Sequence, residues 1–576
     1  MQNVYCNPLN LSYRYQHIKS FGRWIYHREG ADPTLILFKS KYYMFVSMSA
    51  GFWHSDDLVN WQFHENRDLL IYDYAPDVRQ VGEYLYFCAS RRAENCPILR
   101  TLDPLSDSFE QVSAPFPFWD PGLFCDDDGR VYLYWGCSAT EPIYGVELDR
   151  HSMTPIGEKV PLFIGDPVNH GFERPGENCD PDTKKGLVSM IFGGKPFTEG
   201  AFMTKYNGQY YLQYAIPGTE HNTYADGVYI SKNPLGPFEF CAHNPFSSNP
   251  GGFITAAGHG STIQDKYGNW WHASTMRISV NKNFERRVGL FPAGFDKDGV
   301  IFCNQNFADY PIAFPEGKFD PWQIEPKWML LSYKKPVKVS SNHKAHQAEL
   351  AVDEDIRTWW SAATNKPGEY IELDLGDIQI VHAIQVNIAD GEVRGPKHSK
   401  EDMHNEIIGR RFIDSSPQHT RYVLEGSLDG SAWFILEDKR NDDCDLPHDF
   451  FVYEGGNEIR YIKITGYEFP YGQTFKVSGL RVFGMGKGEK PARVEATASR
   501  TGDLDALIQW EKVTNAQGYN IRYGVQPEKL YLSWLVYDQD HLNLPTLNKG
   551  ATYYVCVDSF NENGITTGTT VEIKCQ

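Results

Sequence analysis

The segment TEGAFMTKYNGQYYLQYA, residues 198–215, joins two strand-like stretches through a Tyr-Asn-Gly turn, and the second stretch is strongly aromatic. Four other segments share this layout of a polar side chain beside small residues or proline, a strand, a turn and an aromatic strand. They are ADPTLILFKSKYYMFVS (31–47), APDVRQVGEYLYFCAS (75–90), WDPGLFCDDDGRVYLYWG (119–136) and GHGSTIQDKYGNWWHAS (258–274). Repetition of one such unit is typical of β-propellers. We therefore predict an all-β fold that begins with a five-bladed β-propeller.

The polar residues at the start of these units point to one shared site. The first strand of each propeller blade lines the central axis, so residues far apart in sequence can meet there. In this chain those residues are Asp32, Asp77, Asp120, Glu199 and His259. Three converging carboxylates can cleave a glycosidic bond with inversion, if the base and the acid stand about 6.5–9.5 Å apart with water between them. A nearby ionised carboxylate raises the pKa of the acid and keeps it protonated.

The same five segments, in this order, resemble glycoside hydrolase family 43, a family of inverting enzymes built on a five-bladed propeller. The resemblance covers roughly residues 25–305. It implies that Asp32 is the general base, Asp120 the carboxylate that adjusts the pKa of the acid, and Glu199 the general acid. It also implies that His259 lies against a central metal ion, commonly calcium. Asp77 is expected to support the pocket or contact sugar.

Each of these residues also has a structural interpretation. An Asp beside a proline commonly marks a turn, which applies to Asp32 when it is taken alone. A histidine between two glycines, as at His259, can simply fill a closely packed core. The repeats favour the catalytic interpretation for Asp32, whereas both interpretations stay open for His259.

Further residues are candidates for substrate binding. Trp53 and Trp119 are possible stacking platforms for a sugar ring, although tryptophan in a propeller also fills the gaps between blades. Arg287 resembles the fifth-blade arginine that contacts sugar in some family members, and Arg286 is the alternative for this role. The stretch 150–197 is longer than a blade needs, and we interpret it as an insertion that shapes the pocket.

Changes in the pattern of strand-like segments and turns divide the chain into four parts. Residues 1–315 are assigned to the propeller (the N-terminal region) and 316–336 to a linker. Residues 337–487 (the middle region) and 488–576 (the C-terminal region) carry short alternating strands that predict two β-sandwich domains.

Resemblances give these two sandwiches further expectations. Residues 340–485 resemble the discoidin, or factor 5/8 C-terminal type, domain, which is also the fold of carbohydrate-binding module family 32. In some such domains a structural calcium binds near this point of the chain, and Asp353 and Asp355 are the candidate ligands. The C-terminal region resembles a fibronectin type III domain, which is usually a spacer.

Composition limits the partners. The formal net charge of −19 argues against nucleic acid or an anionic membrane, because both bind clustered Lys and Arg. The 11 cysteines include no CxxC pair, so neither a zinc motif nor a redox motif is indicated. We expect a monomer that acts on a carbohydrate substrate and has no nucleic-acid or membrane partner. The chemistry is expected to need no cofactor, and a structural calcium is possible.

The start of the sequence leaves the compartment open. The first residues, MQNVYCNPLNLSYRYQH, lack a positively charged start followed by an apolar run. The compartment is therefore left unknown: secreted or periplasmic if a signal was trimmed, and otherwise cytoplasmic.

Taken together, the sequence predicts an exo-acting glycosidase that releases terminal α-L-arabinofuranosyl or β-D-xylosyl residues from plant polysaccharides or oligosaccharides. A galactosyl or galactofuranosyl hydrolase of the same family is an alternative. Two further alternatives are a non-catalytic carbohydrate-binding propeller and a structural adhesion protein.

Overall fold

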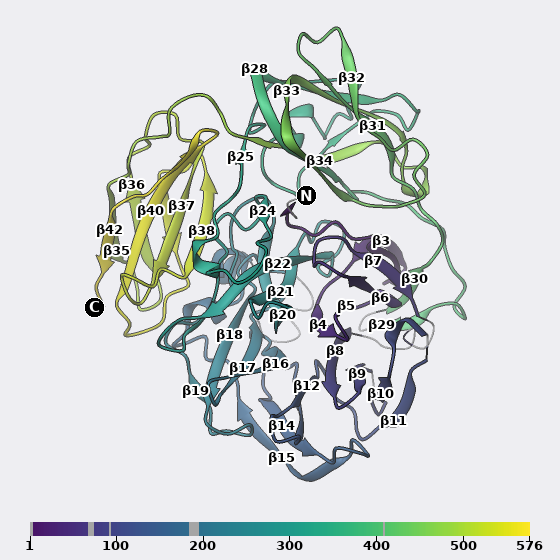
Figure 1. Ribbon diagram of the computed structural model, residues 1–576, viewed down its shortest axis with the longest axis vertical. Helices are drawn as coiled ribbons and strands as arrows, with labels where there is room; N and C mark the ends of the chain where they lie inside the picture. Colours follow the sequence, from purple (N-terminus) through teal and green to yellow (C-terminus); the bar gives the residue numbers. More distant parts are fainter. Residues whose placement is uncertain are drawn as a thin grey trace.

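The structure is a computed structural model, and it describes residues 4–66, 69, 74–91, 94–106, 108–183, 195–406 and 409–575. Within these ranges the chain forms β-strands and short 3₁₀ turns and no α-helix, which confirms the all-β prediction (Figure 1). No helix among the described residues has the length and apolar character needed to cross a membrane. The 3₁₀ turns are η2 (Pro104–Ser106), η3 (Gly171–Glu173), η4 (Glu177–Cys179), η5 (Pro181–Thr183), η6 (Pro321–Gln323), η7 (Ala348–Ala351) and η8 (Pro470–Gly472).

The N-terminal region is built from consecutive antiparallel meanders. Three of them are separate four-stranded sheets, in which each strand pairs with the next along the chain. Their strands are β4 (Thr34–Phe38), β5 (Lys41–Phe45), β6 (Gly51–Ser55) and β7 (Gln62–Glu65); β8 (Tyr74–Val81), β9 (Tyr84–Ser90), β10 (Ile98–Thr101) and β11 (Glu110–Ser113); and β12 (Gly122–Cys125), β13 (Val131–Trp135), β14 (Ile143–Leu148) and β15 (Pro155–Phe163).

Two further meanders are joined into one eight-stranded sheet by a single parallel bridge between Ala225 and Ala257. Their strands are β16 (Glu199–Tyr206), β17 (Gln209–Ile216), β18 (Ala225–Ser231) and β19 (Glu239–Phe240), and β20 (Thr255–Gln264), β21 (Trp270–Arg277), β22 (Arg286–Phe295) and β23 (Ile301–Cys303). Because these two meanders form one sheet, the number of blades stays a prediction.

The first strands of the meanders meet one another. β4 contacts β8, β8 contacts β12, β12 contacts β16, β16 contacts β20, and β20 contacts β4. In Figure 1 these strands lie near the middle of the region, while β7, β11, β15 and β19 lie farther out. Ser261 of β20 connects the last meander to the first, because its hydroxyl donates to the Pro33 carbonyl and accepts from the Leu35 amide. The residues just ahead of these strands are thereby brought together.

Aromatic side chains fill the spaces between neighbouring meanders, and this explains why the second strand of each unit is so aromatic. Phe45, Phe52 and Phe87 share one buried cluster between the first two sheets. Trp53 and Trp271 share another, between the first meander and the last. Flat rings contribute large buried areas in such gaps.

The start of the chain is tied to the middle region. β2 (Arg14–Ser20) pairs with β3 (Arg23–Glu29) and also with β30 (Gly409–Asp414), which pairs with β29 (His404–Glu406). Two strands from the start of the chain and two from the middle region thus form one four-stranded sheet. The first strand, β1 (Val4–Tyr5), pairs with β24 (Ile312–Ala313).

The middle region contains an eight-stranded antiparallel sheet around a core that includes the fully buried Trp360. Its strands are β25 (Met329–Leu330), β26 (Val337–Val339), β27 (Trp360–Ser361), β28 (Tyr370–Ile388), β31 (Arg421–Ser427), β32 (Trp433–Asp438), β33 (His448–Glu468) and β34 (Lys476–Gly484). The first of these strands comes from the segment that the sequence assigned to the linker.

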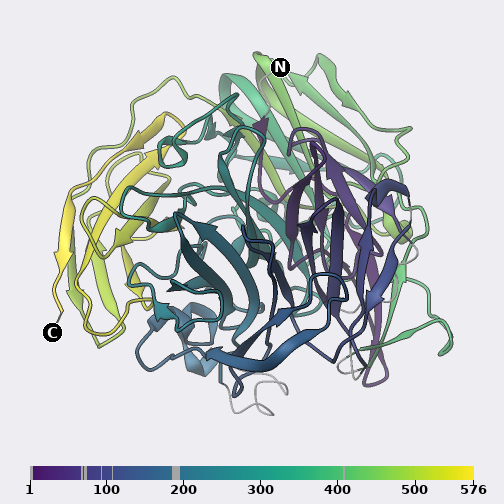
Figure 2. The ribbon, with the colours of Figure 1, turned by 60° about the horizontal axis from the view of Figure 1, so that its bottom comes forward.

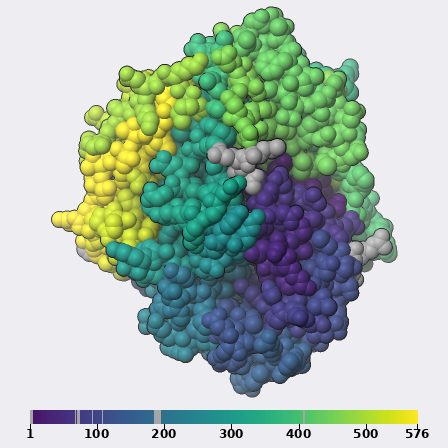
Figure 3. Space-filling view, viewed as in Figure 1, coloured from purple at the N-terminus to yellow at the C-terminus, as the bar shows by residue number. Residues whose placement is uncertain are grey.

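The C-terminal region has two sheets with one shared core. The strands are β35 (Ala496–Arg500), β36 (Ala506–Trp510) and β39 (His541–Leu544) in one sheet, and β37 (Gly518–Gly524), β38 (Leu532–Tyr537), β40 (Tyr553–Asn561), β41 (Gly564–Thr566) and β42 (Thr570–Ile573) in the other. Figures 2 and 3 show this region, in yellow, packed directly against the teal strands of the N-terminal region.

Candidate active site

The residues that begin the meanders share an unusual backbone conformation. Asp32, Ala75, Asp120 and His259 have φ angles of 52°, 50°, 48° and 51°. Residues other than glycine seldom adopt this left-handed backbone conformation, and they do so mainly where the surrounding structure holds them in it. The repeated geometry directs the side chain at this position toward the same central point.

Hydroxyl groups from the preceding meander hold three of these residues in place. Each hydroxyl comes from the end of a second strand and accepts a hydrogen bond from the backbone N–H of the next left-handed residue. The pairs are Thr275 with Asp32 at 2.8 Å, Ser47 with Ala75 at 2.7 Å and Ser90 with Asp120 at 2.9 Å. The positions of Asp32, Ala75 and Asp120 are therefore set by a neighbouring meander.

His259 lies between the carboxylates. Its Nδ1 atom is 3.4 Å from Asp32 Oδ1 and 3.9 Å from Asp120 Oδ2. Among the described residues, Asp120, Cys137 and Glu199 form a group whose oxygen and sulfur atoms lie within 4.8 Å of one another. The structure thus brings Asp32, Asp120, Glu199 and His259 into one cluster.

Asp32 is buried and ionised. Its Oδ1 accepts a hydrogen bond from Arg286 at 3.1 Å, and its Oδ2 accepts one from the Ser47 hydroxyl at 2.6 Å. Burial alone would raise the pKa of Asp32, but the positive charges of Arg286 and His259 and the hydroxyl hydrogen bonds hold it below its ordinary value. The carboxylate can therefore accept a proton at neutral pH.

Asp120 and Glu199 are shifted in the opposite direction. Burial raises the pKa of Asp120, and repulsion from Glu199 and Asp32 adds to it, bringing it to about 7 against the opposing charge of His259. Burial likewise raises the pKa of Glu199. Two adjacent carboxyl groups of this kind titrate as a pair and retain a proton near neutral pH.

A protein-family model and several known proteins match the N-terminal region. The model of the glycosyl hydrolases family 43 matches residues 23–301. This part of the chain is a family 43 domain. The chain is 26% identical over 290 residues to a xylan 1,3-beta-xylosidase from a Vibrio species, which covers 44% of this chain and 49% of that protein. It is 25% identical over 312 residues to an arabinoxylan arabinofuranohydrolase from Paenibacillus polymyxa, covering 44% and 46%.

The chain therefore spans about half the length of these two relatives. A solved structure described as a glycoside hydrolase overlaps 78% of this chain and 97% of its own, with 18% identity and a TM-score of 0.45.

The family 43 domain contains two site residues that the sequence did not indicate. The Tyr224 hydroxyl donates to Glu199 Oε1 at 2.6 Å, and the Cys137 thiol donates to Glu199 Oε2 at 3.2 Å. Tyr224 lies just before β18 and Cys137 just after β13. Neither belongs to a repeated motif, so only the packing of the meanders could identify them.

Gly200 shows how closely this domain packs at its centre. Its φ is +66°, and a Cβ atom there would come within 2.9 Å of the His259 ring. A larger residue would displace His259 from between the two aspartates.

The donor atoms near His259 are not all of the kind that calcium prefers. Burial would lower the pKa of His259, but the charges of Asp32, Asp120 and Glu199 raise it above its ordinary value. Ca²⁺ takes six to eight oxygen ligands, whereas the donor group at hand includes the Cys137 thiol. Calcium at His259 stays a prediction.

Asp77 lies within β8, two residues after the left-handed residue Ala75. Its Oδ2 accepts from the Leu123 amide at 2.6 Å and its Oδ1 from the Thr34 hydroxyl at 3.2 Å. Burial raises the pKa of Asp77 to about 6. Both oxygens thus bridge neighbouring first strands, and Ala75 occupies the position equivalent to Asp32.

The two tryptophans expected at the substrate are in different environments. Trp53 is 1% exposed and packs against Phe63, with ring centroids 4.8 Å apart. In this arrangement no face of its ring can stack on a sugar. Trp119 is partly exposed beside Asp120, so its role as a platform stays a prediction.

The two adjacent arginines of β22 point in different directions. Arg286 contacts Asp32, as described above, whereas Arg287 donates to Asp390 and His448 of the middle region. The structure therefore places Arg286, the alternative considered from the sequence, at the carboxylate cluster and places Arg287 away from it.

Residues 184–194 of the insertion lie outside the described residues. The described part of the insertion lies near the site. Glu177 forms an ion pair with Arg277 at 2.7 Å, and Arg277 also donates to the Glu220 carbonyl. Glu220 precedes Tyr224 in the same loop, so the insertion supports the loop that holds Glu199.

Asp353 and Asp355 lie together in the middle region. Asp353 accepts hydrogen bonds from the Thr358 hydroxyl and the Asp355 amide, and burial raises its pKa to about 6. A structural calcium there stays a prediction.

Proposed function

We propose that this chain is an exo-acting, inverting glycoside hydrolase that releases terminal α-L-arabinofuranosyl or β-D-xylosyl residues, acts as a monomer, and carries its site on a five-bladed propeller. The observation that carries the proposal is the opposite direction of the pKa shifts within one cluster. Asp32 is held ionised, while the pair of Asp120 and Glu199 retains a proton. Such a division of roles between carboxyl groups is what general acid–base catalysis requires.

The reaction then follows from the positions of the groups. Asp32 takes a proton from a water molecule, and the oxygen of that water attacks the anomeric carbon. As the glycosidic bond breaks, Glu199 gives its proton to the leaving oxygen, so the sugar is released with inverted configuration. Asp120 keeps Glu199 protonated, and His259 balances the charge.

The sugar class comes from the relatives, whose names describe a xylosidase and an arabinofuranohydrolase. A galactosyl or galactofuranosyl hydrolase is the alternative within the family. A non-catalytic sugar-binding protein is a weaker alternative, because binding needs no split between an ionised and a protonated carboxyl group. We further propose a discoidin-like middle region and a fibronectin type III-like C-terminal region, both β-sandwiches, with a structural calcium at Asp353 and Asp355.

Hydrolysis of nitrophenyl arabinofuranoside, xyloside and galactoside tests the proposal, with the configuration of the first product determined by NMR. We expect turnover with inversion. Asp32→Ala should lose about two to four orders of magnitude on every substrate, because water is no longer activated. Glu199→Ala should lose as much on poor leaving groups and far less on activated ones, which need little protonation.

Asp128→Ala, in an exposed turn, is the matched control and should keep full activity. Absence of turnover on the whole panel and on arabinan and xylan would refute the proposal that the chain is a glycoside hydrolase. A loss in Glu199→Ala that is equal for all leaving groups would refute its role as the acid.

A further inference from the structure

The middle region contacts the catalytic centre through two strands that lie side by side. β3 ends with Arg28 and Glu29, β22 begins with Arg286 and Arg287, and the two strands are in contact. Adjacent residues of a strand point to opposite faces. One residue of each pair therefore points toward the carboxylate cluster, and the other points toward the middle region.

On the side of the cluster, Arg286 links the two strands to the base. It forms an ion pair with Glu29 at 2.7 Å and contacts Asp32 at 3.1 Å. All three side chains are at most 4% exposed. The ionised state of Asp32 therefore depends on where Arg286 is held.

On the opposite side, one carboxylate of the middle region holds both strands. Asp390 Oδ2 pairs with Arg287 at 3.0 Å, and Asp390 Oδ1 accepts hydrogen bonds from Arg28 and, at 2.7 Å, from the Tyr15 hydroxyl. The Arg28, Arg287 and Asp390 side chains are at most 1% exposed. The arginines at the two strand ends thus share one buried acid from a segment far along the chain.

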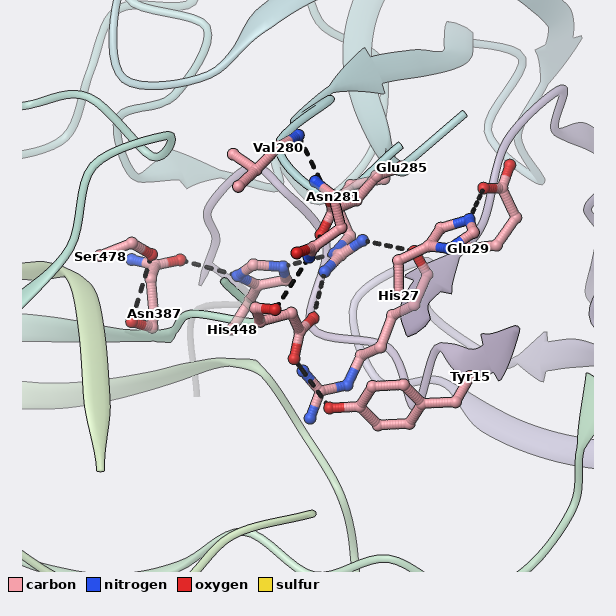
Figure 4. A network of polar contacts seen from close by, with 12 residues as sticks. Tyr15, His27, Glu29, Val280, Asn281, Glu285, Asn387, His448 and Ser478 are labelled. Atoms are coloured by element: carbon pink, nitrogen blue, oxygen red, sulfur yellow. Dashed lines mark hydrogen bonds and ion pairs between the residues drawn. The ribbon is translucent and has the colours of Figure 1, made fainter. Parts of the chain in front are cut away.

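Neighbouring groups fix the orientation of this contact. His448 Nδ1 bonds to Asn387 Oδ1 at 2.8 Å, so its Nε2 is the atom that accepts from Arg287 Nε at 2.9 Å. Burial and the two arginines lower the pKa of His448 well below its ordinary value, so the ring is neutral. Figure 4 shows Tyr15, Asn387 and His448 around this network. A cavity of about 10 Å³ beside Asp390 leaves space for no more than a single water.

From this geometry we propose that Asp390 is a positioning residue for the base Asp32, so that the middle region is a working part of the catalytic unit. Asp390 fixes the ends of β3 and β22 relative to each other, and this fixes Arg286 against Glu29 and Asp32. The inference rests on the proposed function, because it concerns the same base.

The test compares Asp390→Asn with Asp445→Asn in the full-length chain. Asp445 also pairs with Arg28 of β3, at 2.6 Å, and accepts a hydrogen bond from the Thr420 hydroxyl of the middle region. Within the described part of the chain it forms no ion pair with β22, so it is a control carboxylate on the same arginine that does not join the two strands. We expect Asp390→Asn to lower kcat by about 10- to 100-fold with little change in KM, as small displacements of catalytic groups do. The acidic limb of its pH profile should move to higher pH, because Arg286 no longer lowers the pKa of Asp32.

Asp445→Asn should keep the acidic limb of the wild type. A fall in kcat without a shift of the limb, or an unchanged kcat in Asp390→Asn, would overturn the proposal. If Asp390→Asn does not fold, Arg287→Lys replaces it, since Lys keeps the charge but loses the forked contacts. The acidic limb of the pH profile must then move to higher pH in Arg287→Lys. An acidic limb that stays in place would contradict the positioning role of Asp390.

A second measurement does not require turnover. The pKa of Asp32 can be followed by carboxyl ¹³C NMR, with Asp32→Asn used to assign the signal. It should rise in Asp390→Asn and stay constant in Asp445→Asn. An unchanged pKa overturns the positioning role even if the chain hydrolyses no sugar, so this result is separate from a failure of the proposed function.

Discussion

At the scale of single residues, the site depends on charges that a motif does not show. Asp32 and Asp120 have the same backbone conformation and both lie near His259, yet their pKa values shift in opposite directions. The difference comes from Arg286, which pairs with Asp32, and from Glu199, which lies beside Asp120. The environment, and not the residue type, assigns the roles of base and acid.

These shifts predict a bell-shaped pH dependence of kcat/KM. The base must be deprotonated, so activity should persist as the pH falls until the lowered pKa of Asp32 is reached, below the ordinary range of an aspartate. The pair of Asp120 and Glu199 must keep a proton, so activity should be lost as the pH rises above about 7. Asp120→Asn removes one negative neighbour and should move the alkaline limb to lower pH. An alkaline limb that stays in place in this variant would contradict the assignment.

At the scale of elements, single side chains lock neighbouring meanders together. Asp226 of β18 accepts hydrogen bonds from the His259 amide at 2.6 Å and the Gly260 amide at 3.0 Å, and it contacts His272 at 3.0 Å. The part of β20 that contains His259 is therefore held by the meander before it. Ser47 and Thr275 have the same function elsewhere in the region.

We predict that Asp226→Ala destabilises the protein strongly. The substitution leaves the partly buried His259 amide and the buried Gly260 amide without this acceptor, which should lower the free energy of unfolding by about 3 kcal/mol. Urea denaturation followed by intrinsic fluorescence measures this change. Asp128→Ala, in an exposed turn, is the control and should unfold like the wild type. A loss in Asp226→Ala no larger than in this control would show that other groups hold β20.

At the scale of the whole molecule, the regions share buried contacts. One hydrophobic cluster contains Val4 and Phe307 of the N-terminal region, Phe483 of the middle region, and Leu535 and Phe560 of the C-terminal region. The cluster joins segments that the sequence assigned to separate domains. Contacts of this kind couple the unfolding of the parts that share them.

We therefore predict a single thermal transition for the full-length chain. Differential scanning calorimetry should give one peak, and loss of turnover should coincide with it. Phe560→Ala removes a large ring from the shared cluster and should lower the midpoint of the entire transition. Two resolved transitions in the wild-type chain, with turnover lost in only one of them, would show that the regions unfold independently.

The sequence by itself determined the all-β class and the positions of Asp32, Asp120, Glu199 and His259, because a strand–turn–strand unit is a local pattern that repeats in the printed order. Only the tertiary structure decided which neighbours these residues have. The choice between Arg286 and Arg287 depends on which face of β22 meets the cluster, and the burial of Trp53 depends on how two meanders pack. Long-range packing also brought Cys137 and Tyr224 to Glu199 and Asp390 to the ends of β3 and β22, since no spacing along the chain encodes contacts between distant segments.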